Sequence, residues 1–528
     1  MKSLFKCMIA VSVAVSLFGC GDKIKTVVSA PVNAQNSLKI LAGSEVKDME
    51  PLIRQAEKAL NISVALSYSG TIEGVEKIQS SNDFDAAWFS QSKYFYESPE
   101  SAKKIKISEK IMLSPVVVGV RQSSYQKLSA KDDTPVSWAD ISTWVTKNKL
   151  TYAMTDPSES NTGYIALMGV SYSLAGKGES LKPQDVNKAK MKDFFQGHLI
   201  NSGSSGWLVD AFAKSKADFI INYESSLLQY NKKNPQDQLV IIYPFEGIVT
   251  SDYPMLLLEQ SKSEQYKKLT EYLKSPDSQK WIVENVNRRS INSQVMSEQK
   301  VFNKKLLIEM PFSPSAEVSE QLLAAYYNDF KKPSVLAFVL DTSGSMSEGT
   351  REKDMKGAIA NLTVNVANNS RFAKLREREK VYVIPFSSEA YDVKKFDIGL
   401  NEQEASNSRQ AINGYVSSLR MDGGTSVFSS TLKAVEILQK DMKNSPDYRY
   451  SVIVFTDGVS NKGISASEFA TAVKAIGLDV GQIRVFPVLF GEGSKDQLEI
   501  LASSTGGRVF DGKSQSLSSV FKQIRSFQ

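Results

Sequence analysis

The chain has 528 residues, and its hydrophobic content of 41% and charged content of 23% are ordinary for globular protein. At about 100–200 residues per domain, this length predicts three or four compact units. The net charge of +6 is weak for such a length, and the sequence contains no polybasic block and no nucleic-acid-binding motif. We therefore expect no nucleic-acid partner.

Residues 1–19 have the pattern of a targeting segment. Lysines precede a short apolar run, residues 7–18, which is shorter than the about 20 residues that a membrane-spanning helix needs. The run ends in Leu17-Phe18-Gly19-Cys20, which resembles a bacterial lipobox. The resemblance implies a lipoprotein signal peptide, cleavage before Cys20 and lipidation of its thiol. The alternative is an ordinary signal peptide that contains a cysteine.

Residues 20–37 are polar and contain Pro31, so we predict a flexible tether that carries the lipid. Loss of Cys7 with the leader and lipidation of Cys20 would leave no thiol for a disulfide, so that stability would depend on core packing. No later apolar stretch is long enough to span a bilayer, so the lipid would be the only membrane anchor. We expect a location in the bacterial cell envelope, facing the periplasm or the exterior.

From residue 38 the pattern alternates between strand and helix. Three successive strands are predicted at 38–42, 62–68 and 85–89, and each ends in small hydroxyl residues before a predicted helix. Helix N-termini carry free N–H groups, so these strand ends favour binding of anions or carboxylates.

The next stretch predicts a second lobe. A β-branched run at 112–120 is expected to cross into it, and Ser137 or Asp140 is expected to cap a helix. A loop at 156–163 follows a short strand and precedes a helix predicted to start at Tyr164. Further strands are predicted at 219–222, 239–243 and 255–258, and further helices at 49–60, 71–79, 266–273 and 279–286.

The order of these pieces resembles a two-lobed periplasmic solute-binding protein over residues 38–311. The resemblance is carried by Gly43-Ser44, Ser69-Gly70-Thr71, the loop 156–163 and Asn222-Tyr223-Glu224. It implies a small ligand in a cleft between two lobes. The residues implied to face that cleft are Ser44, Ser69, Thr71, Ser90, Asn161, Thr162 and Tyr223. For each of them, a role as a helix cap or turn residue is the alternative.

The identity of the ligand stays open at this point. Glu45 departs from a neutral anion pocket, because a carboxylate would repel an anion or recognise a cationic group such as an amine. Trp88 and Trp207 would stack on a ligand or belong to the core, which is the more frequent role of buried tryptophan. We also expect that the ligand closes the two lobes by a hinge motion.

Residues 312–332 are predicted to form a connecting helix. Apolar side chains lie at helical spacing from Glu317 to Phe330, which indicates a helix packed on a domain instead of a free linker. Tyr326 and Tyr327 are interpreted as packing residues of this helix.

The stretch 333–528 opens on an apolar run, Val335–Leu340, which predicts a strand buried on both faces of a parallel sheet. Asp341, Ser343 and Ser345 follow it at once, with Gly344 allowing a tight turn. In an open α/β sheet, ligands bind beyond the carboxyl ends of the strands. The sequence therefore predicts a binding site at this strand end.

Two later pieces complete a set of oxygen ligands. Asp422-Gly-Gly-Thr425 is a glycine loop that presents a hydroxyl, and the buried strand 451–456 ends in Asp457. The combined set contains hydroxyls and carboxylates but no sulfur or imidazole. Such hard ligands suit a divalent cation, most favourably Mg²⁺ and also Mn²⁺ or Ca²⁺, instead of zinc or copper.

This combination resembles the metal-ion-dependent adhesion site of von Willebrand factor A domains. The resemblance implies direct ligation by Ser343 and Ser345, and direct or water-mediated ligation by Thr425. Asp341 and Asp457 would ligate directly or through water and would hold the hydroxyls in place. In this family one coordination position stays open, and the carboxylate of a protein partner often fills it.

The remaining elements of this stretch also alternate between helix and strand, which predicts a doubly wound, mostly parallel, Rossmann-like α/β domain. Helices are expected at 353–367, 427–442, 465–476, 496–503 and 517–527, and strands at 381–386, 484–490 and 506–510.

The sequence offers little for catalysis. Its one histidine, His198, lies far along the chain from the aspartate–serine cluster, and no nucleophile elbow or phosphate loop is present. We expect a binding protein and not an enzyme. The first hypothesis is a lipoprotein for adhesion, sensing or assembly, with a small ligand at one domain and a protein partner at the other. The alternative is the receptor of an ABC-type uptake transporter with an accessory A domain.

Overall fold

The computed structural model describes residues 37–96, 99–128, 135–177, 181–297, 302, 307–310, 316–364, 374–457, 460–478, 480–489, 495–512 and 517–527. The predicted signal peptide, Cys20 and the tether up to residue 36 lie outside them. No helix in the described ranges has both the length and the apolar character needed to cross a membrane.

Five strands of the first lobe lie in the described residues: β1 (Leu38–Gly43), β2 (Val64–Ser69), β3 (Ala86–Trp88), β4 (Ile107–Lys110) and β11 (Pro254–Leu257). They form a sheet in the order β2-β1-β3-β11-β4, in which the first three strands are parallel and β11 is antiparallel to both neighbours. The helices of this lobe are α1 (Glu50–Leu60), α2 (Thr71–Ser80), α3 (Lys93–Tyr96), α4 (Pro99–Lys104), α11 (Ser263–Lys274) and α12 (Pro276–Val286).

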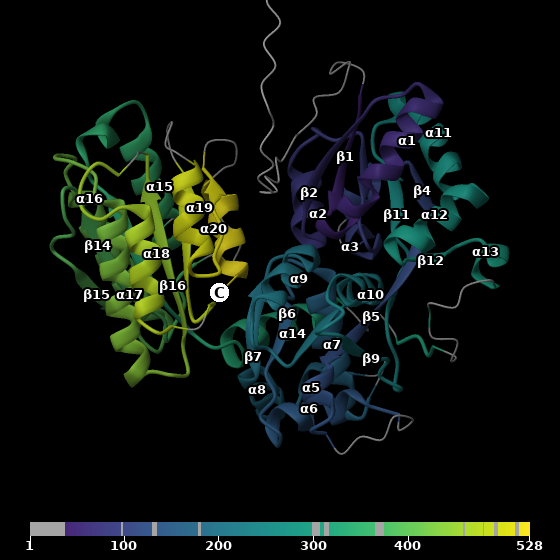
Figure 1. Ribbon diagram of the computed structural model, residues 1–528, viewed down its shortest axis with the longest axis horizontal. Coiled ribbons are helices and arrows are strands. Elements are labelled where there is room, and N and C mark those ends of the chain that lie inside the picture. Colours follow the sequence, from purple (N-terminus) through teal and green to yellow (C-terminus); the bar gives the residue numbers. More distant parts are fainter. Residues whose placement is uncertain are drawn as a thin grey trace, which may run out of the picture.

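The second lobe is built on β5 (Met112–Arg121), β6 (Tyr152–Thr155), β7 (His198–Ser202), β8 (Phe219–Tyr223), β9 (Leu239–Ile242), β10 (Thr250–Ser251) and β12 (Arg289–Ser290). The main path of its sheet is β10-β5-β8-β6-β7, and β9 and β12 also pair with β5. Its helices are α5 (Gln122–Tyr125), α6 (Trp138–Thr146), α7 (Asn161–Ala175), α8 (Lys188–Gln196), α9 (Ser205–Ala213) and α10 (Glu224–Lys233), and α13 (Ser293–Ser297) follows β12. Figure 1 shows the two lobes one above the other.

The C-terminal domain has six described strands: β13 (Ser334–Asp341), β14 (Lys380–Phe386), β15 (Lys394–Asp397), β16 (Arg449–Thr456), β17 (Ile483–Leu489) and β18 (Phe510–Asp511). Their order is β15-β14-β13-β16-β17-β18, and all neighbours are parallel except β14 and β15. The described helices are α15 (Arg351–Thr363), α16 (Glu402–Ser418), α17 (Val427–Asn444), α18 (Ala466–Ala475), α19 (Lys495–Ser503) and α20 (Leu517–Ser526).

Strand β13 explains the layering of this domain. Its six apolar residues from Val335 to Leu340 are all 0% exposed, because successive side chains point to opposite covered faces. Leu336, Phe338 and Leu340 pack into the core with α15, α16 and α20, whereas the alternate residues pack with α17, α18 and α19. The predicted α/β fold class, doubly wound in this domain, is therefore confirmed.

The connecting helix, α14 (Ala316–Ala325), continues into a π-helical turn, Tyr326–Phe330, on the surface of the second lobe. Phe195 of α8 stacks on Phe330, with ring centroids 5.9 Å apart, and contacts Tyr326 edge-on. Tyr164 donates a hydrogen bond of 2.5 Å to Ser319. The helix thus fixes the start of the C-terminal domain against the second lobe.

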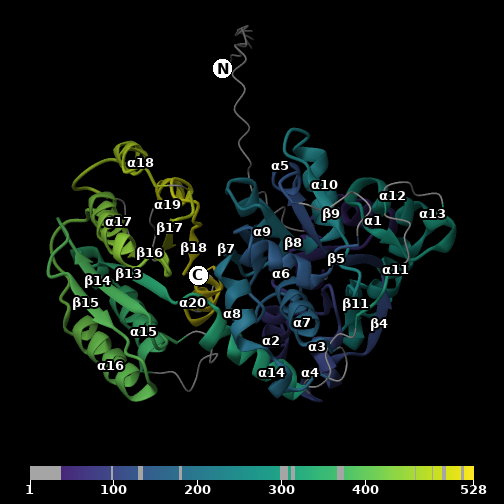
Figure 2. The same cartoon turned by 90° about the horizontal axis from the view of Figure 1, so that it is seen from below.

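The C-terminal domain contacts both lobes. Lys331, at the end of the connecting helix, forms a buried ion pair with Asp156 of the second lobe, at 3.1 Å, and Arg484 of the C-terminal domain donates to the carbonyl of Asn201 at 3.1 Å. Gln523 of α20 donates to Glu73 of the first lobe at 3.1 Å. Figures 1 and 2 both place α20 on the side of its domain that faces the lobes.

Some predicted elements differ from the observed ones. Helix α7 begins at Asn161 and not at Tyr164, because Asp156 accepts backbone hydrogen bonds from Glu159 and Ser160 and so closes the loop earlier. The expected strand 506–510 is reduced to Phe510–Asp511. Several observed elements were not predicted from the sequence, among them β15, α16, α8, β7, α9 and α10.

Candidate metal centre and solute cleft

Asp341 is the last residue of β13, and its carboxylate is held from two sides. The backbone N–H of Ser343 donates to Oδ1 at 2.9 Å, and the Thr456 hydroxyl donates to Oδ2 at 2.7 Å. The residue is 0% exposed, and burial raises its pKa to about 6. Strands β13 and β16 are parallel neighbours, which brings Asp341 beside Thr456 at their carboxyl ends.

The two serines of the loop lie next to the second aspartate. The hydroxyl oxygens of Ser343 and Ser345 are 3.2 Å apart, and Ser345 donates to Oδ1 of Asp457 at 3.0 Å. Asp457 follows β16 directly. Four of the five residues predicted to hold a metal therefore form one hydrogen-bonded group.

Thr425 reaches the same edge of the sheet from a separate loop. The carbonyl of Gly423 accepts from the Gly344 N–H at 3.2 Å, and the Asp422 N–H donates to the Thr342 carbonyl at 2.7 Å. Gly423 has φ +85°, a conformation that side chains disfavour. These contacts dock the threonine loop on the serine loop, and Thr425 itself is 5% exposed.

Arg351 also belongs to this site, although it was not predicted from the sequence. It is the first residue of α15, and its Nη1 donates to Oδ2 of Asp457 at 2.6 Å and to the Ser345 carbonyl at 3.0 Å. The guanidinium therefore neutralises the carboxylate that the serine also contacts. Arg351 stands at the start of the helix that follows the serine loop, and this position in the sequence could have identified it as part of the site.

The donors of this site fit a hard divalent cation. Two serines, a threonine and two aspartates supply oxygen only, which is the ligand type of Mg²⁺, Mn²⁺ and Ca²⁺. In the described part of the chain, no group of three or more His, Cys, Asp or Glu side chains forms a metal cluster. A cation here would be held by hydroxyls and two carboxylates: Asp341, Ser343, Ser345, Thr425 and Asp457.

Five of the seven predicted cleft residues lie where the two lobes meet. Asn161 donates to the Tyr223 hydroxyl and to Ser251, both at 3.0 Å, and accepts from Tyr94 of the first lobe at 2.9 Å. The hydroxyls of Thr71 and Ser90 are 3.1 Å apart within the first lobe, and Ser90 also hydrogen-bonds the Tyr223 hydroxyl of the second lobe. Ser44 accepts from the Gly206 N–H of the second lobe at 3.4 Å, across the boundary between the lobes.

The other two predicted residues make contacts inside their own lobes. Ser69 donates to the carbonyl of Gly70 at 3.0 Å, which is a turn contact. Thr162 lies 2.8 Å from Thr155 and 3.1 Å from Ser205, hydroxyl to hydroxyl. For Ser69, the turn role that the sequence left open matches the contact observed.

The lobes are in contact at the start of α2. The N–H of Ile72 donates to the Glu159 carbonyl at 3.1 Å, so a carbonyl of the second lobe already caps this helix N-terminus. A Cβ at Gly70 would lie only 2.6 Å from that carbonyl oxygen. Glycine is therefore required for the lobes to approach so closely.

Glu45 is the unusual charge of the cleft. It is 8% exposed, its Oε1 has no hydrogen-bond partner among the described residues, and burial raises its pKa to about 7. Arg288 binds the backbone carbonyl of Glu45 at 2.7 Å and pairs with the carboxylate of Asp48. A carboxyl group thus stays in the cleft without a directly bonded cation.

The two tryptophans considered as ligand platforms occupy other places. Trp88 is 0% exposed, and its indole N–H donates to the Tyr253 carbonyl at 3.1 Å, so it belongs to the core. Trp207 of α9 packs against the core of the C-terminal domain, with its ring 6.1 Å from that of Phe527. His198 is buried, stacks on Tyr152 and shares its Nε2 between two backbone carbonyls.

Comparison with known proteins gives each domain a family. Residues 38–285 match the family model of the bacterial extracellular solute-binding protein, and residues 336–523 match that of the von Willebrand factor type A domain. No protein with curated annotation matches the chain.

Several solved structures are similar to this chain. The periplasmic binding protein AfuA of Actinobacillus pleuropneumoniae, with fructose-6-phosphate bound, is 14% identical with a TM-score of 0.43, over 56% of this chain and 98% of that one. A substrate-binding protein of an ABC transporter from Agrobacterium tumefaciens is 14% identical with a TM-score of 0.43, over 56% and 94%. The sulfate-binding protein SubI of Mycobacterium tuberculosis is 14% identical with a TM-score of 0.40, over 50% and 90%.

These findings define the class of protein. It is a two-domain α/β protein in which a bacterial extracellular solute-binding domain precedes a von Willebrand factor type A domain. The first family is typical of proteins that act outside the cytoplasm, and the second commonly holds a divalent cation.

Proposed function

We propose that this protein is a lipid-anchored binding protein of the bacterial cell envelope. Its N-terminal domain takes up a small solute between its lobes. Its A domain holds a divalent cation, most favourably Mg²⁺, and grips a protein partner that offers a carboxylate to that cation. The role is adhesion, sensing or assembly, and no reaction is catalysed.

One observation carries this proposal. Asp341, Ser343, Ser345 and Asp457 form one hydrogen-bonded group at the carboxyl ends of β13 and β16. The chain runs from β13 to β14 on one side and later to β16 on the other side, so this edge is a topological switch point of the sheet. Oxygen ligands at such a point support a cation that an outside partner can reach.

A pull-down from solubilised cell envelope tests the adhesion role. The soluble chain from residue 21 onward is used as bait, in Mg²⁺ and in EDTA. We expect a partner that is captured only with the metal and is lost in Ser345→Ala. Ser347→Ala is the matched control, because Ser347 lies two residues further along the same loop and is exposed. Capture that ignores both EDTA and Ser345→Ala would contradict the proposal.

The alternative function is the receptor of an ABC-type uptake transporter. The match of residues 38–285 to the extracellular solute-binding family favours it. The same pull-down separates the two functions, because a transport receptor would capture a permease whether or not metal is present. A gene neighbourhood with a permease and an ATPase would point the same way.

The lipid anchor at Cys20 has its own test. Cys20→Ser should release the protein from the membrane fraction into the soluble fraction, because no other membrane anchor is proposed. Cys7→Ser is the control, since Cys7 lies within the leader. If Cys20→Ser stays with the membrane after a high-salt wash, the lipid anchor is ruled out.

The carboxyl oxygen Oε1 of Glu45, which has no hydrogen-bond partner among the described residues, bears on the identity of the solute. Above its pKa of about 7 the Glu45 carboxylate would repel a free anion, whereas a hydroxyl or ammonium group would donate a hydrogen bond to its Oε1. We therefore propose a solute that donates hydrogen bonds, and closure of the lobes on it by a hinge. Small-angle scattering that shows no compaction on binding would dismiss the hinge.

A further inference from the structure

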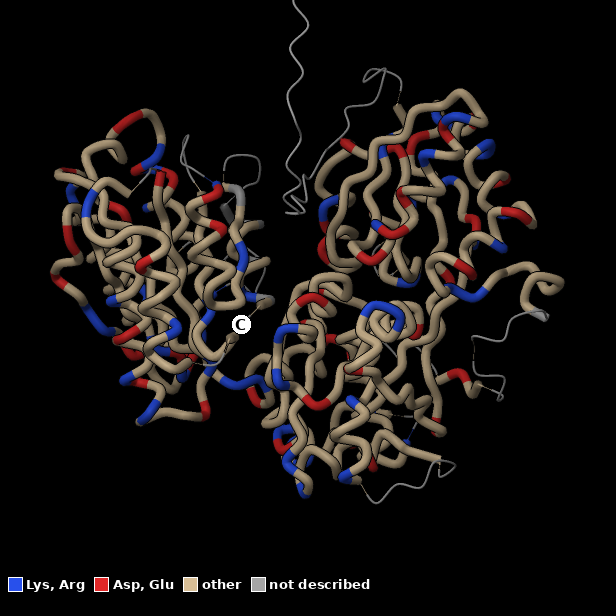
Figure 3. Tube along the Cα trace, in the orientation of Figure 1, with Lys and Arg blue, Asp and Glu red and all other residues tan. Residues whose placement is uncertain are grey.

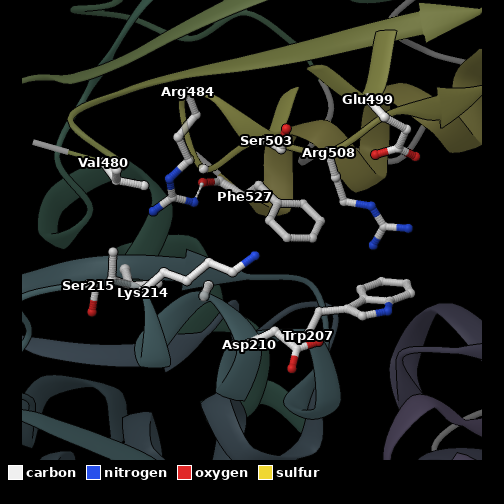
Figure 4. A pocket seen from close by; sticks show the side chains of 15 residues that line it. Trp207, Asp210, Lys214, Ser215, Val480, Arg484, Glu499, Ser503, Arg508 and Phe527 are labelled. Carbon is white, nitrogen blue, oxygen red and sulfur yellow. Dashed lines mark hydrogen bonds between the residues drawn. The ribbon is translucent and has the colours of Figure 1, made fainter. Parts of the chain in front are cut away.

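A cavity of about 320 Å³ lies between the second lobe and the A domain, away from the metal centre and the cleft. The lobe contributes residues of β7, α9 and the turn after α9, and the A domain contributes residues around β17, α19 and its C-terminus. Figure 4 shows the labelled side chains of the two domains facing each other across it. This volume is in the range of small-molecule sites.

Arg508 is the central feature of the cavity. Its guanidinium lies over the ring of Trp207 at 4.0 Å and near the rings of Phe510 and Phe527, at 5.1 and 5.6 Å. Burial lowers its pKa to about 10, so the group is still a cation at neutral pH. Within the described residues it has no hydrogen bond and no ion pair. A guanidinium offers five N–H donors in one plane, and these donors are left for a ligand.

Two more cations line the same space. Arg484 is 6% exposed and uses its Nη1 for the carbonyls of Asn201 and Phe527, at 3.1 and 3.0 Å. Lys214 extends from the end of α9 toward the cavity (Figure 4), and in the described part of the structure its ammonium has no ion pair. Asp210 and Glu499 are the acidic residues of the lining, so the three cations leave it with a net charge of +1 (3 − 2).

Apolar surface completes the arrangement. The rings of Trp207 and Phe527 are stacked at 6.1 Å between centroids, at an angle of 29°, and Ile200 and Val480 also line the cavity. A flat apolar body fits against such rings, and a negatively charged group fits the guanidinium donors beside them.

We propose that this cavity is a binding site for a small organic anion, with a carboxylate or phosphate group on a flat apolar body. Arg508 and Lys214 bind the anionic oxygens, and Trp207 and Phe527 hold the apolar body. Because both domains line the site, the bound anion contacts both and stabilises their docked arrangement. The proposal does not depend on the metal centre or on the solute of the cleft.

The test uses the full soluble chain labelled with 5-fluorotryptophan and phenyl phosphate as the probe. The chain has five tryptophans, and Trp207→Phe assigns the fluorine resonance of Trp207. We expect phenyl phosphate to shift that resonance saturably and to leave those of buried Trp88 and Trp138 in place. Benzylamine, a cation of similar shape, should have no such effect.

Two variants make the outcome decisive. Arg508→Gln should weaken binding at least tenfold, and Lys214→Gln, at an exposed position, should weaken it by a smaller factor without a risk to folding. Arg54→Gln is the matched control, because Arg54 is a half-buried arginine of α1 that pairs with Glu57 and does not line the cavity, and this variant should bind as the unaltered chain does. The proposal is overturned if Trp207 does not respond at millimolar phenyl phosphate, if benzylamine acts equally, or if both variants bind normally.

Discussion

The metal centre and the solute cleft contain the same kinds of polar side chain, but these side chains find their hydrogen-bond partners in different places. Both lie at the carboxyl ends of parallel strands that carry hydroxyls and a carboxylate. In the cleft, the opposite lobe supplies partners, as Tyr94 does for Asn161. In the metal centre, the hydroxyls of Ser343 and Ser345 contact each other and the two aspartates of the same domain, and Ser345 is half-buried.

The two sites therefore differ in what they require from outside their own domain. Hydrogen bonds between the lobes close the cleft, so a solute that entered it would have to replace them, and its binding would be linked to lobe movement. The residues of the metal centre are held by strands and loops of a single domain, so a cation could bind without movement of one domain against another. Figure 3 shows acidic and basic residues interspersed over both domains, so local geometry and not a field of one sign distinguishes the sites.

The largest effect is expected at the centre of the cleft network. Asn161→Leu leaves the hydroxyls of Tyr94, Tyr223 and Ser251 without their shared partner, and unsatisfied buried groups of this kind should lower the free energy of unfolding by about 3 kcal/mol. Urea unfolding followed by hydrogen exchange of N-terminal-domain peptides measures it. Asn285→Leu, exposed on α12, is the control. Equal losses in both variants would show that the network is not tightly formed.

The second effect concerns the pH dependence of the cleft. The pKa of Glu45 is raised by burial from 4.5 to about 7, so between these values the folded state holds a proton that the unfolded state lacks. Stability therefore falls as the pH rises through this window, and the loss of about 3 kcal/mol persists above it. Glu45→Gln should abolish this loss, so the variant should be the more stable form at pH above 7.

Unfolding of the chain and of Glu45→Gln at acidic and at mildly alkaline pH measures this effect. The difference between the two proteins should be small at the acidic end and should grow toward the alkaline end. A constant difference would mean that the carboxyl group titrates normally and has a partner in solution.

The third effect separates the metal centre from the cleft. Ser345→Ala removes one predicted ligand and should weaken Mg²⁺ binding on the order of 100-fold, as measured by calorimetry. Since Ser345 is only half-buried, the free energy of unfolding measured without metal should change by less than about 1 kcal/mol. This small change would contrast with the larger one expected for Asn161→Leu. An unaltered Mg²⁺ affinity would contradict the assignment of Ser345 as a metal ligand.

The sequence predicted the two sites unequally, for physical reasons. Asp341, Ser343 and Ser345 lie within five residues at the end of a strongly apolar strand, so local pattern placed them correctly beside one another. The cleft residues come from many separate strand ends, and their partners, such as Ser251 and Tyr94, depend on how the lobes meet. Trp207 was considered for the cleft, but its contacts with Arg508 and Phe527 arise only from docking of two domains.

The smallest expected effect is that of Arg351 on the Mg²⁺ affinity of the metal centre. Its guanidinium pairs with Asp457 at 2.6 Å, and the Asp457 side chain is 0% exposed, so this cation takes part of the charge that a metal would use. Arg351→Gln should raise Mg²⁺ affinity about tenfold, or about 1.4 kcal/mol, because a competing cation is gone. The variant should also be less stable without metal, since the buried carboxylate of Asp457 loses its partner. Addition of Mg²⁺ should therefore raise the melting temperature of the variant by more than it raises that of the unaltered chain. Arg351→Lys keeps the charge and serves as the control. If Arg351→Gln instead weakens Mg²⁺ binding, the arginine positions Asp457 for the metal and does not compete with it, and the metal centre would then depend on an internal partner as the cleft does.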